Sequence, residues 1–482
     1  MVKRRGPDPV RAEVQLPRAF AHAVVFLLAV AAGLPRAAEG AKDKTSTKPA
    51  GSERAKKPEA QWQYLQARVS PLDEYGIPGG WVSGQSMRTR RTVPKGLALP
   101  DGMGEDVRFA VWRCPRTKKG RMLLAIAKSG KDGSHDTLWV DSDFDGSLAD
   151  EEAINRGGPA GGGWHVELGL PGKSGPALHK LGLYLFGSGG RSVFARSEIW
   201  REGTVEVGGA ERKCTLVDFS GNGSYNDVSM NFKGSDRIRI ETGGEWVTYV
   251  VGRYIDIDGV LYRLDVIPDG SKVSFTPAKD VPMAAVSLPK GMAELVVYGE
   301  TGTYYLRAEK GALWLPAGRH RVESWTMRRK DEAAGEWQLT GRLTHDTAPL
   351  VLKPDKKPKL LDVGEPVVGF LSVIGKEGHH TVSGGIRGRR GERLYLVQSP
   401  LAAQVPGSAT VKPRIRIRSS DGEYDQSFEV AGQWGGRGES RRKGVEWWAP
   451  EGTAGPFTVT VEVDGPFKLK ARKHLIRDAR GE

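Results

Sequence analysis

Short apolar runs separated by turn residues fill the sequence from Gln61 onward, and this pattern limits the possible folds most. Examples are VRFAVWRC, RMLLAIAKSG, WVTYVVGRYIDIDG and VLYRLDVIPDGSKVSF, and Asp-Gly pairs mark several of the turns. Such runs with Asp-Gly turns are typical of β-hairpins. The 64 glycines and 29 prolines suit frequent turns, and little of the chain has helical periodicity. We therefore predict an all-β protein with few helices.

The length of 482 residues predicts about two to four domains. Changes in composition, and the Pro-flanked boundaries PAKDVP and KPDKKPK, divide the chain further. The predicted parts are a signal peptide (1–40), a disordered tether (41–60), a β-rich domain with calcium-type loops (61–280), a β-sandwich module (283–353) and a C-terminal β-sandwich module (360–478). Two short helices are expected, one in QWQYLQARV and one after Asp150.

The N-terminal region has the order of residues found in export signals. The apolar run AHAVVFLLAVAAGL follows several basic residues and is followed by small residues in RAAEGA. Basic, apolar and small residues in this order are typical of a secretory signal peptide. The run is shorter than the roughly 20 residues that cross a bilayer, and an uncleaved membrane anchor is the alternative. We expect a secreted, periplasmic or cell-surface protein, with no stable membrane span once the signal is cleaved.

The net charge of +14 raises the question of a polyanionic partner. Residues 1–60 contain twelve basic and six acidic residues, so the rest of the chain carries a net charge of +8. This excess is modest, and export argues against a nucleic-acid partner. An anionic cell-surface polysaccharide is the partner that an exported basic protein fits better.

Four basic residues in KPRIRIRSS suggest one place for such a partner. They recur at every second position: Lys412, Arg414, Arg416 and Arg418. In a strand they would project from one face, and tryptophans lie nearby in the sequence. The alternative is a solvated strand face with tryptophans in the core.

Cys114 and Cys214 both fall in the predicted domain 61–280. In an oxidising compartment they could form a disulfide, which would stabilise the folded domain by about 4–5 kcal/mol in the chain-entropy model. Two separate buried thiols are the alternative.

The most specific motif is LWVDSDFDGSLADEE, residues 138–152, which matches the calcium-loop template D-x-[DN]-x-[DN]-G-x5-E. The candidate ligands are Asp141, Asp143 and Asp145, the backbone carbonyl of Ser147, and Glu152 as the closing acid, with Gly146 at the sharp turn. Calcium takes six to eight oxygen ligands, and alternate carboxylates on a tight loop can converge on one ion. The spacing therefore predicts a calcium site.

This stretch resembles an EF-hand calcium-binding loop, in a variant that is entered from a strand, DTLWV. The resemblance implies calcium as the cofactor and an ion that locks a turn of an exported protein. The alternative is an acidic strand-to-helix turn in which Asp141 and Asp143 cap the helix.

A second stretch, TLVDFSGNGSYND, repeats part of the pattern. Its candidate ligands are Asp218, Ser220, Asn222 and Asp227. Position 12 is Ser229, so the closing acid is missing and weaker binding is expected. An Asn-Gly hairpin turn is the alternative.

The segment LWLPAGRHRVESW resembles the strand-turn-strand of carboxypeptidase-regulatory-like and PEGA-type β-sandwich modules. The resemblance implies a non-catalytic spacer or adhesion module.

The chain has no H-E-x-x-H motif, and the sequence identifies no catalytic residue. We expect an exported calcium-binding protein with a structural, scaffolding or cell-surface binding role. An extracytoplasmic enzyme that acts on polysaccharide is the alternative.

Overall fold

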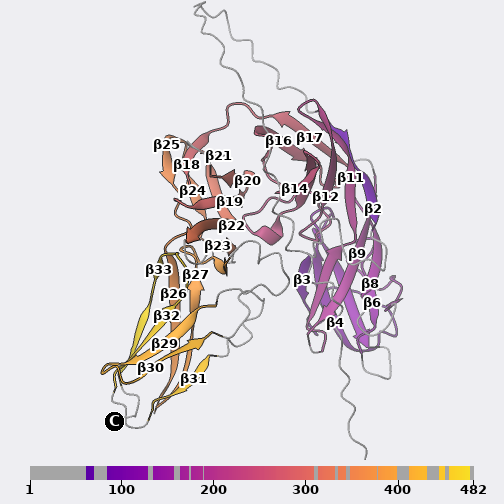
Figure 1. Ribbon diagram of the computed structural model, residues 1–482. Helices are drawn as coiled ribbons and strands as arrows, with labels where there is room; N and C mark the ends of the chain where they lie inside the picture. The colour runs from indigo at the N-terminus through magenta and orange to yellow at the C-terminus, as the bar shows by residue number, and fades with distance from the viewer. Residues whose placement is uncertain are drawn as a thin grey trace, which may run out of the picture. The chain divides into compact units, whose positions relative to one another are not determined.

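The computed structural model describes residues 61–69, 84–128, 134–156, 163–172, 175–187, 189–308, 313–331, 335–342, 348–376, 378–398, 412–430, 444–450 and 455–477 (Figure 1). All of them belong to one compact unit, Glu59–Glu482. The predicted signal peptide (1–40) and tether (41–60) lie outside the described residues. The regular elements are strands, apart from one 3-10 turn, η1 (Phe232–Gly234). The prediction of an all-β fold is confirmed.

Two sheets near the start of the described chain form a first β-sandwich. One sheet has the order β4 (Glu105–Arg113), β5 (Arg121–Lys128), β6 (Thr137–Val140), β7 (Ile154–Asn155). The other has the order β3 (Gln85–Arg88), β10 (Ser192–Ser197), β9 (Ala177–Phe186), β8 (Trp164–Leu170). One hydrophobic core receives side chains from both sheets, including the fully buried Trp112, Leu124 and Leu183. Alternate residues of each strand supply this core because successive side chains point to opposite faces.

A second sandwich follows the same principle. Its larger sheet has the order β14 (Glu245–Val250), β13 (Arg237–Thr242), β12 (Ala210–Val217), β11 (Ile199–Val207), β2 (Gln66–Val69). Its smaller sheet has the order β1 (Gln63–Tyr64), β17 (Lys272–Pro277), β16 (Val260–Val266), β15 (Tyr254–Ile257). Both sheets contribute to one core, with Leu216, Ile238 and Val273 at its centre.

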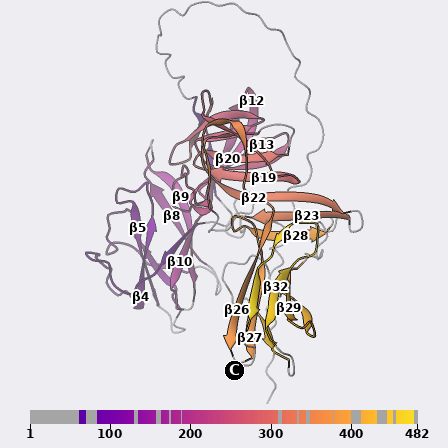
Figure 2. The ribbon, with the colours of Figure 1, turned by 90° about the vertical axis from the view of Figure 1, so that its left-hand side faces the viewer.

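The remaining strands form three further sheets, and several strands of the largest one are labelled in Figure 2. The largest has the order β20 (Gly302–Arg307), β19 (Met292–Gly299), β22 (Gly318–Asp331), β23 (Gly335–Arg342), β28 (Arg393–Gln398), β27 (His379–Arg387), β26 (Val367–Lys376), β33 (Leu469–Lys470), with β24 (Leu350–Leu352) on β22 and β31 (Val445–Trp448) on β27. A three-stranded sheet has the order β21 (Leu313–Pro316), β18 (Met283–Ser287), β25 (Asp355–Leu360). A four-stranded sheet has the order β30 (Asp425–Glu429), β29 (Arg414–Ser419), β32 (Phe457–Glu462), β34 (Lys473–Ile476).

The large sheet connects the two predicted C-terminal modules. β23 pairs with β28 along six residue pairs, from Trp337 with Gln398 to Arg342 with Arg393. One hydrophobic core also contains residues of both parts, such as Trp325 and Leu396. The expected module boundaries stay predictions. However, β23, in the predicted module 283–353, and β28, in the predicted module 360–478, are hydrogen-bonded neighbours in one sheet.

Both short helices predicted from the sequence are wrong. Gln63–Tyr64 is β1, which pairs with β17, and Gln66–Val69 is β2, which pairs with β11. After Asp150 the chain enters the short strand Ile154–Asn155, which pairs with β6. Pairing with a neighbouring strand outweighs the local helical preference of such short segments.

His320, on β22 of the large sheet, is a buried titratable side chain, so the pH dependence of stability can test its burial. The ring is fully buried, and its Nε2 lies 2.8 Å from the carbonyl oxygen of Pro316. Nε2 therefore carries the proton and donates, and burial holds the pKa of His320 below its ordinary value. The unfolded chain takes up a proton near pH 6.5, whereas the folded chain resists it. The difference between the two pKa values therefore makes folding more favourable at high pH. Its contribution to the free energy of unfolding is complete above pH 6.5 and is lost as the pH falls toward the folded-state pKa.

We predict that His320→Gln, which can still donate to Pro316 but does not titrate, weakens this pH dependence. Between pH 7 and pH 5 the free energy of unfolding should fall less steeply in the variant, by at most about 1.4 kcal/mol for each pH unit. Urea unfolding at several pH values measures both slopes. Parallel curves for the two proteins would contradict a buried neutral imidazole.

Candidate metal site and the second acidic loop

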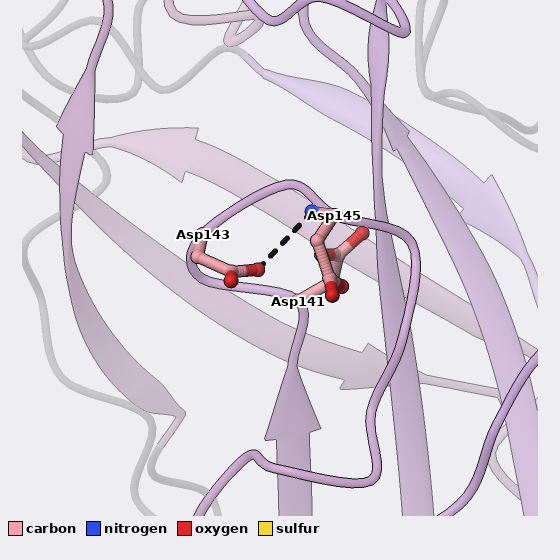
Figure 3. A group of neighbouring side chains, drawn as sticks. All are labelled: Asp141, Asp143 and Asp145. Carbon is pink, nitrogen blue, oxygen red and sulfur yellow. Dashed lines mark hydrogen bonds between the residues drawn. The ribbon is translucent and has the colours of Figure 1, made fainter.

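The loop that follows β6 brings three carboxylates together. Asp141 continues the strand, since its N–H donates to the Leu123 carbonyl at 3.0 Å, and its side chain is buried. Asp143 and Asp145 follow on an exposed turn (Figure 3). One ligand oxygen from each of the three lies within 4.8 Å of the others. Among the described residues, this is the group of acidic, histidine or cysteine side chains that could hold a metal ion.

The backbone of the loop fixes these side chains. The Gly146 N–H donates to Asp141 Oδ1 at 3.1 Å, and the Asp145 N–H donates to Asp143 Oδ1 at 3.1 Å. The Ser147 N–H donates to Asp145 Oδ1 at 2.6 Å. Each bond uses one oxygen of a carboxylate and leaves the second oxygen for an ion. Gly146 has a φ of +85°, where a side chain would be strained, which explains the glycine at the turn.

Leu148 anchors the far end of the loop. Its side chain is fully buried beside Trp139 and Phe109, and its N–H donates to the Ala98 carbonyl at 2.9 Å. Burial raises the pKa of Asp141, and the nearby Asp145 and Asp143 raise it further. The three carboxylates are thus held close enough for Asp143 and Asp145 to repel the charge on Asp141. The Lys119 ammonium also lies at the loop, where it donates to the Asp145 carbonyl, and a bound metal ion would have to share the loop with it or displace it.

The closing acid differs from the template. Glu152 is exposed and lies outside the three-carboxylate group. Glu151 turns back to the loop instead, where its carboxylate accepts hydrogen bonds from the Ser142 N–H and, at 2.9 Å, from the Ser142 hydroxyl. The backbone after the loop is not helical, and in extended chain adjacent side chains point to opposite sides. The template could not show this, because it assumes a helix after the loop.

The second loop gathers its four predicted residues through hydrogen bonds. Asp218 is fully buried and accepts N–H bonds from Gly221 at 2.7 Å and Gly223 at 2.8 Å. Ser220 Oγ and Asn222 Nδ2 both donate to Asp227, at 2.7 and 2.6 Å. The two neutral side chains therefore offer hydrogens rather than oxygens toward Asp227. These contacts satisfy the polar side chains within the loop, which runs from the end of β12 to η1 and β13 and is therefore longer than the Asn-Gly hairpin turn that was the alternative from the sequence.

Asp236 braces this second loop and was missed by the sequence reasoning. Its carboxylate accepts N–H bonds from Phe219 at 3.0 Å, Ser220 at 3.3 Å and Asp227 at 2.8 Å. Burial raises the pKa of Asp236 well above its ordinary value and that of Asp218 to about 7, and repulsion between the carboxylates adds to both shifts. No loop template extends as far as residue 236, so no spacing signal could have identified it.

The two cysteines do not form a disulfide. Cys114 is a buried free thiol in the core of the first sandwich, and Cys214 is a buried free thiol in the core of the second. Burial raises their pKa values to about 11 and about 12, so both remain protonated at neutral pH. Separate buried thiols, the alternative from the sequence, describe the structure.

The basic stripe of β29 does project from one face, since Ile415 and Ile417 between its members are buried. Each basic residue has an acidic partner on a neighbouring segment. The pairs are Lys412 with Glu429, Arg414 with Asp464, Arg416 with Asp425 and Glu462, and Arg418 with Asp425. The four positive charges are balanced by four carboxylates, so the stripe does not present excess charge to a polyanion.

Comparison of the chain with protein-family models, curated proteins and solved structures finds no match. Within the part of the chain that the structure describes, none of the helical segments has the length and apolar character needed to cross a membrane.

Proposed function

We propose that this chain is an exported, multi-domain β protein with a structural or cell-surface binding role, in which calcium bound by the loop after β6 stabilises the first sandwich. The observation that carries the proposal is the convergence of Asp141, Asp143 and Asp145 within 4.8 Å. Hard oxygen ligands on a tight loop are the ligands that calcium prefers.

The residues fit a calcium ion in a further respect. Each carboxylate has one oxygen held by a loop N–H, so the side chains are preorganised and little ordering is needed on binding. Glu151 adds negative charge close to Ser142 at the base of the loop. Export to a compartment with abundant calcium would allow a weak site to be filled, because extracellular modules commonly bind calcium at about 10⁻⁴–10⁻³ M.

We predict that Asp143→Asn weakens calcium binding by tenfold or more. The change keeps the size of the side chain but removes one of the three converging charges, and tenfold corresponds to about 1.4 kcal/mol. Glu152→Gln is the matched control: it also removes one negative charge from the same loop, but from a side chain outside the group. Calorimetric titration of chelator-treated protein with calcium measures the affinity of the wild type and of both variants.

Equal affinities of Asp143→Asn and the wild type would count against the site, as would wild-type protein that shows no saturable binding. A loss of affinity in Glu152→Gln as large as that in Asp143→Asn would mean that general negative charge, not the cluster, attracts the ion.

A further inference from the structure

The outer face of the sheet β3–β10–β9–β8 carries side chains that the fold does not need for its core. Leu181, Leu183 and Ala195 point into the first sandwich, so their neighbours in the strands point away from it. The outward residues include Arg88 on β3, Phe194 and Arg196 on β10, Tyr184 and Phe186 on β9, and His165 on β8, together with the ion pair of Lys180 on β9 and Glu167 on β8.

Aromatic rings form one part of this face. Phe186 is 55% exposed, and its ring contacts that of Phe194 edge-to-face, with centroids 6.0 Å apart. Phe194 lies directly across from Tyr184 in the strand register. A phenylalanine in a strand that is exposed to this extent contributes little to the core and suits contact with a partner.

A polar cluster forms the other part, with Glu198 at its centre. Its carboxylate is almost fully buried and contacts His165 Nδ1 at 2.8 Å, the Tyr184 hydroxyl at 3.2 Å and Arg196 Nη2 at 3.3 Å. Gly182 makes room for this arrangement, since a Cβ there would lie 2.4 Å from Glu198 Oε1. Three strands are thereby tied to one carboxylate, and the rings of His165 and Tyr184 are held in place.

The cluster leaves one polar ring, that of His165, partly exposed to solvent. His165 is bonded through Nδ1, and its side chain remains 30% exposed, so its second nitrogen is available for hydrogen bonding. The Arg196 guanidinium lies over the Tyr184 ring, 5.0 Å from its centroid. Groups that are fixed before binding lose little freedom on binding, which favours affinity.

Positive charge lies at one end of the face. Arg88 is exposed and stands across from Ser192, which stands across from Phe186. Asp106, on β4 of the opposite sheet, contacts three cations: Arg91 at 3.1 Å, Lys128 at 3.2 Å and Arg108 at 3.7 Å. Of these, Arg108 lies near the turn between β9 and β10, since a Cβ on Gly189 would be 3.9 Å from Arg108 Nη2.

We propose that this outer face binds an anionic polysaccharide. Sugar rings would lie against Phe186 and Phe194, hydroxyl groups would bond to His165, and an acidic group would pair with Arg88. A sugar ring presents C–H bonds that are attracted to the negative face of an aromatic ring, and its edges are polar. The proposal rests on the cell-surface binding role proposed above but not on calcium, so the two can fail separately.

The test uses the full chain in the presence of a chelator and measures binding of alginate oligomers, a polyuronate, by calorimetry. We expect saturable binding that weakens with added salt. Phe186→Ala should reduce affinity by tenfold or more, and Arg88→Ala should reduce both the affinity and its salt dependence. Trp448→Ala is the matched control, since Trp448 is 65% exposed on another sheet, and it should change affinity by less than about twofold.

Thermal unfolding of each variant checks that the fold is retained, which the exposure of Phe186 and Arg88 favours. Absence of alginate binding, or equal losses in Phe186→Ala and Trp448→Ala, would overturn the proposal. Equal binding of neutral dextran would overturn the requirement for an anionic partner. Tighter binding of single-stranded DNA than of alginate would replace the polysaccharide with a nucleic acid.

Discussion

Replacing Trp112 with alanine is expected to lower the free energy of unfolding by about 3–5 kcal/mol. Trp112 on β4 is fully buried in the core of the first sandwich, and its ring stacks on buried His179 at a centroid distance of 5.9 Å. Its indole N–H donates to the Gly221 carbonyl at 2.7 Å, in the second acidic loop. The substitution therefore leaves a cavity and also leaves a buried carbonyl without its donor.

Urea unfolding of the full chain, followed by near-ultraviolet circular dichroism, measures the loss. Trp314→Ala is the control, because Trp314 is 49% exposed and should contribute less than about 1 kcal/mol. Trp112→Phe should recover part of the packing but not the hydrogen bond. A loss in Trp112→Ala no larger than that in Trp314→Ala would contradict the central position of Trp112.

Gly302→Ala is expected to lower the free energy of unfolding by about 2–5 kcal/mol, because it combines backbone strain with overpacking. Gly302 has a φ of +129°, which side chains rarely allow, and a Cβ there would lie 2.1 Å from the Tyr254 carbonyl oxygen. It sits at the turn between β19 and β20, where the Thr301 carbonyl accepts the Tyr254 N–H at 2.9 Å. The contact joins residues of the second sandwich to the large sheet.

Gly243→Ala separates the two causes of that cost. Gly243 also has a positive φ, +60°, but a Cβ there would meet no atom within 4 Å. Only the conformational cost of about 1–2 kcal/mol should appear in this variant. Thermal and urea unfolding of both variants provide the comparison. If Gly302→Ala lost no more stability than Gly243→Ala, the close approach of residue 302 to Tyr254 would make no contribution to the free energy of unfolding.

Local features of the sequence predicted the strand content and the first acidic loop. Alternation in KPRIRIRSS predicted that the basic residues share one face of a strand, and in the structure Ile415 and Ile417 between them are buried. The spacing of Asp141, Asp143 and Asp145 placed three carboxylates on one turn. Both follow from backbone geometry over a few residues, so no distant contact was needed to predict them.

Only the tertiary structure decided features that depend on distant partners. Glu151 rather than Glu152 faces the first loop because the chain after the loop is not helical. Asp236 braces the second loop from beyond any local motif, and the two cysteines fall in different cores. The acidic partners of the β29 stripe come from neighbouring strands. Spacing along the chain determines which side chains share a turn or a strand face, whereas strand pairing and packing determine which of those faces meet.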